Sequence, residues 1–277
     1  VYNLMADLTG AGLGGGMRLT GLSSNPDGMY AEDVFARVNG YMHAFRDAFI
    51  VAGKTFNTED PASVMNKIEA ANLRAIDSET LGISGTAGTA VDALGRLIRI
   101  PGRALMAADD FWRVIASRGE LYEQAVRQIR SSKAAGKADV DALDDGLMVL
   151  LDPQYKAGEL DAASRYATLT DDMGEQLTAG TKFIRTFFGR FMGNILMPFA
   201  KAPTNAMRRV GENHPLIVFA STIVNPKSTI RQNLLGQNGA RAQQRAMGRA
   251  ALGSISMGAL YMQAIDGNIT GAYPTDK

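Results

Sequence analysis

Two glycine-containing stretches have spacings that nucleotide-binding motifs use. Gly10–Gly15 fits the pattern G-x-G-x-x-G, whose glycines let a backbone approach a pyrophosphate at a helix N-terminus. That motif needs a preceding strand and a βαβ unit, and the sequence predicts neither. Gly53-Lys54-Thr55 is similar to the end of a phosphate-binding loop, but Ala48 stands where the first glycine is required. We therefore reject nucleotide binding at both stretches.

A third pattern is an incomplete calcium loop. Positions 1, 5, 6 and 12 of the would-be loop hold Asp141, Asp145, Gly146 and Asp152. Leu143 and Val149 occupy positions where oxygen ligands are required, so calcium binding is disfavoured. Aspartates near the positive end of a helix dipole are the better interpretation, and we expect a solvated helix start here.

The remaining ionisable groups do not form a catalytic set. The acidic candidates for proton transfer are Asp109, Asp110, Glu120 and Glu123, and we expect them to be solvated or paired with arginines such as Arg113 and Arg127. His43 and His214 have no second histidine or carboxylate at metal-ligand spacing, and the chain has no cysteine. The sequence thus predicts no catalytic residue, no cofactor and no metal, and a segment that is not an enzyme.

The elements that carry these residues all have helical periodicity. In 31–56, for example, Val34, Phe35, Val38, Met42 and Phe45 recur at helical spacing. Strand alternation with hairpin turns is nearly absent, which predicts an all-α array or bundle. We expect helices over 31–56, from about Pro61, over 91–100, 103–133, 138–151, 159–196, 203–211, 215–223, 226–236 and 239–265, with a break at Pro101.

Composition divides the chain into three regions. Residues 1–28 contain seven glycines between 9 and 28 and are expected to form a Gly-rich linker. Residues 29–180 form an acidic helical region, and residues 181–277 form a basic, apolar helical region. The net charge is −8 over 1–180 and +9 over 181–277, which together give the overall +1. Such asymmetry predicts an anionic partner for the basic region, or pairing with the acidic region.

The basic region contains the candidate binding residues. Between Thr181 and Ile265 the only carboxylate is Glu212. The candidate contacts to membrane or nucleic acid are Lys182, Arg185, Phe187, Arg190, Phe191, Arg208, Arg209, Arg241, Arg245 and Arg249. Residues 182–199 interleave cations with phenylalanines, as a helix lying in a headgroup layer does, but such aromatic stripes belong more often to a core-facing helix. Residues 250–265 are uncharged and rich in small residues, which favours close helix packing over a membrane span.

A hydrophobic cluster around the single tryptophan is the expected structural hub. It comprises Pro101, Leu105, Phe111, Trp112 and Leu121, together with Ile115. The helical spacing predicts that the large apolar members are buried and that the Asp109–Asp110 pair lies near a helix start.

Three blocks resemble segments of very long bacteriophage internal virion proteins and related large polyvalent phage proteins. They are residues 99–112 (RIPGRALMAADDFW) with 118–121 (RGEL), residues 197–205 (MPFAKAPTN) and residues 266–276 (DGNITGAYPTD). Their order and separation also match, and they span about two-thirds of the chain. Because the family continues beyond the third block, we expect this chain to be an excerpt of a longer polypeptide.

The resemblance implies a helical ejection protein. Such a protein is stored inside the capsid near the portal and passes to the host cell envelope, where it helps form a conduit for DNA. The partners implied are copies of itself and other phage core or portal proteins, with genomic DNA and the host membrane as further candidates. Any catalytic domain would lie elsewhere on the full chain. The alternative is a non-catalytic helical domain of a polyvalent effector delivered into the host cytoplasm.

Overall fold

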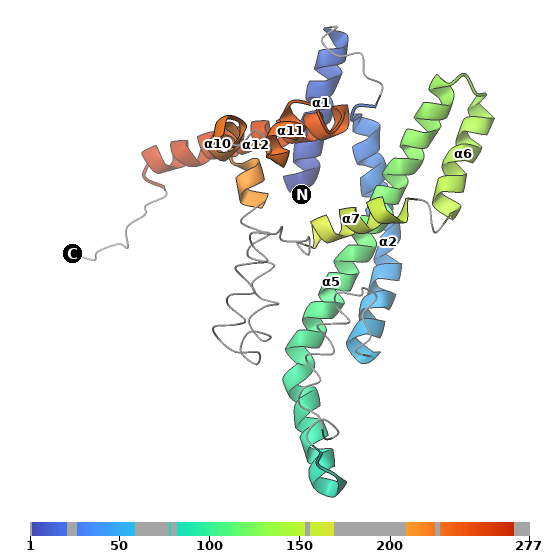
Figure 1. Cartoon of the computed structure of the whole chain (residues 1–277), viewed down its shortest axis with the longest axis vertical. Helices are drawn as coiled ribbons and strands as arrows, with labels where there is room; N and C mark the ends of the chain where they lie inside the picture. The colour runs from blue at the N-terminus through green and yellow to red at the C-terminus, as the bar shows by residue number, and fades with distance from the viewer. Residues whose placement is uncertain are drawn as a thin grey trace. The chain divides into compact units, whose positions relative to one another are not determined.

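The computed structural model describes residues 2–20, 27–58, 78, 82–152, 156–168, 209–224 and 228–268. Every element in these ranges is a helix, and none of the described residues is in a strand (Figure 1). The predicted all-α fold is therefore confirmed. The helices over 31–56, 138–151, 215–223 and 239–265 were also predicted within a few residues of their observed bounds.

The chain folds into two compact units. Unit 1 comprises Val1–Val34 and Ala206–Lys277, and unit 2 comprises Phe35–Asn205. Unit 1 therefore contains residues from both ends of the chain, whereas the charge distribution predicted a single boundary at residue 180. Residue 180 itself lies outside the described residues.

In unit 1, α1 (Tyr2–Leu19) packs along α12 (Ala240–Ile265), and the short helices α10 (Pro215–Val224) and α11 (Thr229–Leu234) join α12. The α1–α12 crossing is close because glycines face each other. A Cβ added to Gly248 would lie 2.1 Å from the carbonyl oxygen of Ala6, and one added to Gly10 would lie 2.4 Å from that of Gln244. Gln244 is 1% exposed and its side-chain oxygen accepts a hydrogen bond from the Met29 backbone N–H at 2.6 Å.

The structure corrects the prediction of a linker over 1–28. Residues 2–19 form α1, and Gly10 and Gly14 lie where α12 passes. Glycine lowers helix propensity by about 1 kcal/mol per residue, so sequence alone favours a loop. Here the missing Cβ atoms permit backbone contact with α12, and this tertiary packing outweighs the local preference.

In unit 2, α2 (Ala31–Thr58) and α5 (Gly85–Ala134) form an antiparallel pair, in which Arg37 meets Glu123 and Thr55 meets Asp110 (Figure 1). At the start of α2, the Tyr30 N–H donates to the Asp33 carboxylate at 3.0 Å, which is one of the two bonds of a capping box. The core between the two helices contains three fully buried residues and three partly buried ones. They are Ala44, Ala48 and Ile115, packed with Tyr41, Phe111 and Val114.

Helix α5 also corrects a predicted boundary. It runs without interruption for 50 residues through Pro101, where the sequence predicted one helix to end and another to begin. It also includes residues 85–90, whose Gly and Thr content favours a loop. Proline disfavours a helical conformation in the preceding residue but does not forbid it. Two residues after Pro101, the Arg103 side chain donates to the Phe56 carbonyl oxygen at 2.7 Å and so ties this part of α5 to the end of α2.

Two further helices cover the C-terminal half of α5. Gly136, with φ of 84°, reverses the chain after α5, so that α6 (Asp139–Leu151) returns along it. Helix α7 (Ala157–Ala167) packs on α5 as well. A core of Leu121, Ala125 and Val149 joins these elements, with Leu160 of α7 against it. The expected helices from Pro61, at 168–196 and at 203–208 lie outside the described residues.

Candidate functional site

The predicted hub around Trp112 is partly confirmed. Ile115 and Leu121 are buried at 4% and 8% exposed, and Phe111 packs against the α2–α5 core. The expected burial of Leu105 and Trp112 is wrong, because these side chains are 56% and 55% exposed. Pro101 is also exposed.

The error at Trp112 has a simple geometric cause. Successive residues of a helix point about 100° apart, so Phe111 and Trp112 cannot both face α2. Phe111 takes the inner position, with its ring 4.9 Å from that of Phe49. Trp112 lies edge-on to Phe111 at 5.2 Å and remains largely on the surface. The sequence pattern identified an apolar side of α5 but not which of two adjacent aromatic residues lies inside.

The acidic pair of α5 is split between two environments. Asp109 forms an ion pair with Arg113 at 3.0 Å, as expected for helix-surface groups. Asp110 is 1% exposed and accepts a hydrogen bond from the Thr55 hydroxyl at 2.6 Å. Both residues lie in the middle of α5 rather than at a helix start, which corrects that prediction.

A buried ion-pair cluster also joins α2 to α5, closer to the N-terminal end of α2. Arg37 of α2 donates to Glu123, which is fully buried, and lies 3.6 Å from Glu120. Glu120 also pairs with Arg127 at 3.2 Å. Glu123 was expected to be solvated or to pair within its own helix. The signal that could have located its partner is Arg37 itself, which is seven residues before Ala44 and therefore on the buried side of α2.

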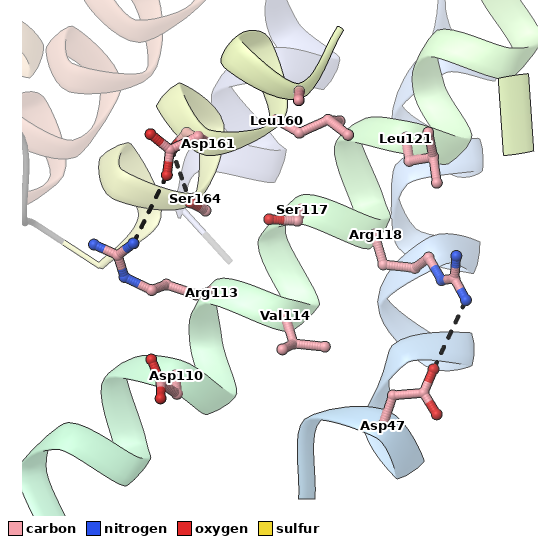
Figure 2. Close-up of a pocket in the computed structure, with 11 residues that line it drawn as sticks. Asp47, Asp110, Arg113, Val114, Ser117, Arg118, Leu121, Leu160, Asp161 and Ser164 are labelled. Atoms are coloured by element: carbon pink, nitrogen blue, oxygen red, sulfur yellow. Dashed lines mark hydrogen bonds and ion pairs between the residues drawn. The ribbon is translucent and has the colours of Figure 1, made fainter. Parts of the chain in front are cut away.

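A groove of about 510 Å³ lies on the surface of unit 2, between α2 and α7 and along α5. Figure 2 shows Arg113 reaching from α5 to Asp161 of α7, while Arg118 points the opposite way to Asp47 of α2. The two N–O distances are 3.8 and 3.7 Å. The residues that line it are Asp47, Asp110, Arg113, Val114, Ser117, Arg118, Leu121, Ala157, Leu160, Asp161 and Ser164.

The polar groups of the groove are held in structural contacts. Asp161 pairs with Arg165 at 2.8 Å as well as with Arg113, and the Ser164 hydroxyl donates to the Asp161 carbonyl oxygen at 2.7 Å. No histidine is among the lining residues, and neither serine is placed against a base by any contact described. The groove therefore has apolar lining residues between two ion pairs. This arrangement suits the packing of another apolar surface better than it suits proton transfer.

The motifs considered for cofactors all lie inside helices. Gly10–Gly15 is part of α1, and Gly53–Thr55 is part of α2. Of the would-be calcium loop, Asp141 and Asp145 belong to α6 and Asp152 is its C-cap residue, while Gly146 packs against Ile129. Over the described ranges, no group of three or more acidic, histidine or cysteine residues is arranged to hold a metal ion.

Asp145, one of these aspartates, links the two ends of the α5–α6 turn. Its carboxylate accepts hydrogen bonds from Lys137 at 2.6 Å and from Ser132. These bonds, with that from Lys137 the larger, hold the pKa of Asp145 below its usual value of 3.8. A residue expected at a solvated helix start therefore fastens α6 to α5.

Three of the described arginines of the basic region form ion pairs within the fold. Arg209 and Arg249 both bond to Glu212, at 3.0 and 3.4 Å, and their side chains are only 13% exposed. Arg245 pairs with Asp7 at 3.0 Å, and the Asp7 side chain is 3% exposed. Asp7 belongs to the acidic part of the sequence, so this pair matches the alternative in which the oppositely charged parts meet.

The other binding candidates differ from these three arginines. Arg241 is partly buried on α12. The remaining candidates, Lys182, Arg185, Phe187, Arg190, Phe191 and Arg208, lie outside the described residues. The sequence predicted close helix packing over residues 250–265. Gly253 is buried as expected, whereas residues 258–268 are exposed. In the part of the chain that the structure describes, no helix is both long and apolar enough to cross a bilayer.

Comparison with known proteins gave no relatives. No family model matches the chain, and neither the curated proteins nor the solved structures that were searched contain a match.

Proposed function

We propose that this chain is a structural segment of a bacteriophage internal virion protein, whose helices pack against copies of itself and against other core or portal proteins. Assembled copies would form part of a helical core or conduit through which DNA passes into the host envelope. The catalytic activities of such a protein, where present, would reside on other parts of the polypeptide.

The observation that carries the structural role is the number of apolar residues on the outer faces of the helices. On α6, the residues that recur along the face turned away from α5 are more than half exposed: Val140, Leu143, Leu147, Met148 and Leu151. On α12, Ile255, Tyr261 and Ile265 are each more than 60% exposed. Helices that are apolar on two sides are typical of elements packed on both sides, and extended apolar surfaces mark interaction sites.

The interior of the molecule supports the same role. The buried polar groups Arg37, Glu123, Asp110 and Thr55 connect helix to helix, and of these four only Asp110 is among the residues that line the groove. Our hypothesis is that these buried hydrogen-bonded pairs specify which helices meet and in what register. The phage assignment rests on the three sequence blocks, of which residues 99–112 and 118–121 form the central part of α5.

An anionic partner needs basic residues that do not already contact carboxylates. Arg209, Arg245 and Arg249 already contact carboxylates, so we assign headgroup or DNA contact to the cations and phenylalanines of 182–208. Binding of the full chain to anionic liposomes and to duplex DNA should be measured over a salt series, because phosphate contacts weaken steeply with salt. Phe187→Ser with Phe191→Ser should abolish liposome binding and leave DNA binding intact if the apolar face inserts. If neither partner binds at low salt, the proposal of an anionic partner is wrong.

Localisation in particles tests the main proposal. We expect quantitative mass spectrometry of purified virions that encode this chain to give a fixed, multiple copy number, and electron cryomicroscopy to show an ordered ring or tube at the portal. A few copies without order would favour the delivered-effector alternative. Absence from the particle would refute the proposal.

A further inference from the structure

Helix α2 has two parallel apolar seams, and the described residues of unit 2 cover only one of them. The first seam, which includes Tyr41, Ala44 and Ala48, packs against α5. The second, one residue further along the chain, has the alternating spacing of three and four residues that coiled coils use. We call it the outer seam, and it consists of Phe35, Val38, Met42, Phe45 and Phe49.

The outer seam is exposed along its length. Its members are 65%, 37%, 67%, 41% and 65% exposed, in chain order. Because neighbouring residues point about 100° apart, the outer seam faces roughly at right angles to the α5-packed seam. A second helix can therefore lie on α2 without displacing α5. At its C-terminal end the seam continues into Phe111 and Trp112 of α5, since Phe45 and Phe49 both contact the ring of Phe111.

We propose that the outer seam pairs with the outer seam of a second copy of this chain, with the two α2 helices antiparallel about a two-fold axis. This inference rests on the proposed assembly function and names the surface that joins two copies. The pairing is isologous, so that each contact occurs twice.

Size complementarity within the seam favours a self-pairing with one register. In an antiparallel pair whose two-fold axis passes between residues 43 and 44, each large side chain faces a smaller one. Phe49 lies opposite the partner's Val38, and Phe45 lies opposite the partner's Met42. Phe35 lies opposite the partner's Ala52, which is half-buried. Alternation of large and small residues lets facing layers interdigitate at native density.

The polar residues beside the seam are compatible with this register. Asn39 and Arg46 flank it on the side away from α5, and both are exposed. The antiparallel arrangement brings Asn39 of one copy near Arg46 of the other, so that an amide oxygen can accept a hydrogen bond from the guanidinium.

The area available is that of a specific interface. Taking about 200 Å² for each large apolar side chain, the observed exposures leave roughly 550 Å² of seam per copy to be covered. Two copies would bury about 1,100 Å² from the seam alone, above the ~1,000 Å² that a biological interface should exceed. Flanking residues and Trp112 would add to this area.

The first experiment is sedimentation equilibrium of the full chain and of two matched variants. Met42→Glu places a charge in the centre of the outer seam, whereas Met5→Glu makes the same change on α1, where Met5 is 52% exposed and lies outside the apolar surfaces proposed for assembly. We expect a dimer or a higher even-numbered assembly whose pairwise Kd rises at least about 100-fold in Met42→Glu and is nearly unchanged in Met5→Glu. Far-UV circular dichroism checks that both variants keep their helices.

The second experiment determines orientation and register by disulfide trapping, which is clean because the chain has no cysteine. Val38→Cys and Phe49→Cys proteins are oxidised separately and as a mixture. In the proposed register residue 38 faces residue 49 of the other copy, while two copies of residue 38 lie about 16 Å apart along the helix axis. A disulfide needs Cα atoms within roughly 7 Å. We therefore expect cross-linking only in the mixture.

Each other outcome overturns the inference. A monomeric chain would mean that something else covers the seam, and an assembly insensitive to Met42→Glu would mean that copies meet elsewhere. Cross-linking of each single-cysteine protein with itself would show a parallel pair. None of these results would affect localisation in the virion, and a chain that pairs as proposed but is missing from particles would refute the proposed function alone.

Discussion

The Arg37–Glu123 ion pair offers the sharpest test of how unit 2 is held together. Glu123 is fully buried and Arg37 is 7% exposed. Removing one partner of a buried pair leaves a charge without its counterion in a low-dielectric interior, which typically costs about 3–5 kcal/mol. We expect Arg37→Met to lower the free energy of unfolding of unit 2 by about that amount.

The matched control is Arg118→Met. Arg118 pairs with Asp47 at 3.7 Å, but the two side chains are 41% and 55% exposed. Exposed pairs contribute about 0–1 kcal/mol, so the same substitution should have little effect there. Both arginines join α2 to α5, and the comparison therefore isolates burial as the variable.

The assay is urea unfolding followed by the fluorescence of Trp112, the only tryptophan in the chain, which lies in unit 2. With a urea m-value of about 2 kcal/mol/M, a loss of ~4 kcal/mol would lower the midpoint by about 2 M. Arg37→Met combined with Glu123→Leu should recover much of this loss, because no charge then remains buried. If Arg37→Met costs no more than Arg118→Met, the pair does not behave as a buried one and the reasoning is wrong.

Three further predictions concern other parts of the fold. Gly248→Ala should destabilise unit 1 by about 1–3 kcal/mol because its Cβ would meet Ala6. Gly258→Ala, whose Cβ would have nothing within 4 Å, should instead stabilise α12 by up to ~1 kcal/mol. Thermal melts followed by circular dichroism compare the two variants, and equal effects would contradict the close crossing. Trp112→Ala should lower the free energy of unfolding less than Ile115→Ala does, because Trp112 is half exposed. For Ile115→Ala a loss of about 2–5 kcal/mol is expected. Urea titrations followed by circular dichroism measure both losses, and the reverse order would place Trp112 in a core. The lowered pKa of Asp145 means that its charged form stabilises the folded state above about pH 3.8 and that this contribution is lost as pH falls through the folded value. Asp145→Asn should therefore reduce the loss of thermal stability between about pH 6 and pH 3, with Asp144→Asn as control, and an unchanged pH profile would argue against the Lys137 and Ser132 contacts.

Periodicity in the sequence was sufficient to predict the all-α fold and several helices of unit 2 and α12. Helical spacing of apolar residues is a local property, and the burial of one stripe stabilises a helix whichever partner covers it. The same local reasoning expected the carboxylates of this helix to be solvated or paired with arginines such as Arg113 and Arg127, and the Asp109–Arg113 and Glu120–Arg127 pairs are observed because residues four and seven apart share a helix face. It could not distinguish two adjacent seams of α2, since both have the same period.

The tertiary structure decided what depends on a distant partner. Gly10 and Gly14 lie in a helix rather than a linker because α12 crosses them, and no feature within residues 1–28 shows that crossing. Arg37 meets Glu123 across 86 positions of sequence. Asp7 meets Arg245 across 238 positions, and this pair joins the acidic and the basic parts of the chain. Local propensities differ by about 1 kcal/mol per residue, whereas close packing and buried ion pairs each involve several, and the larger energies determine which helices meet.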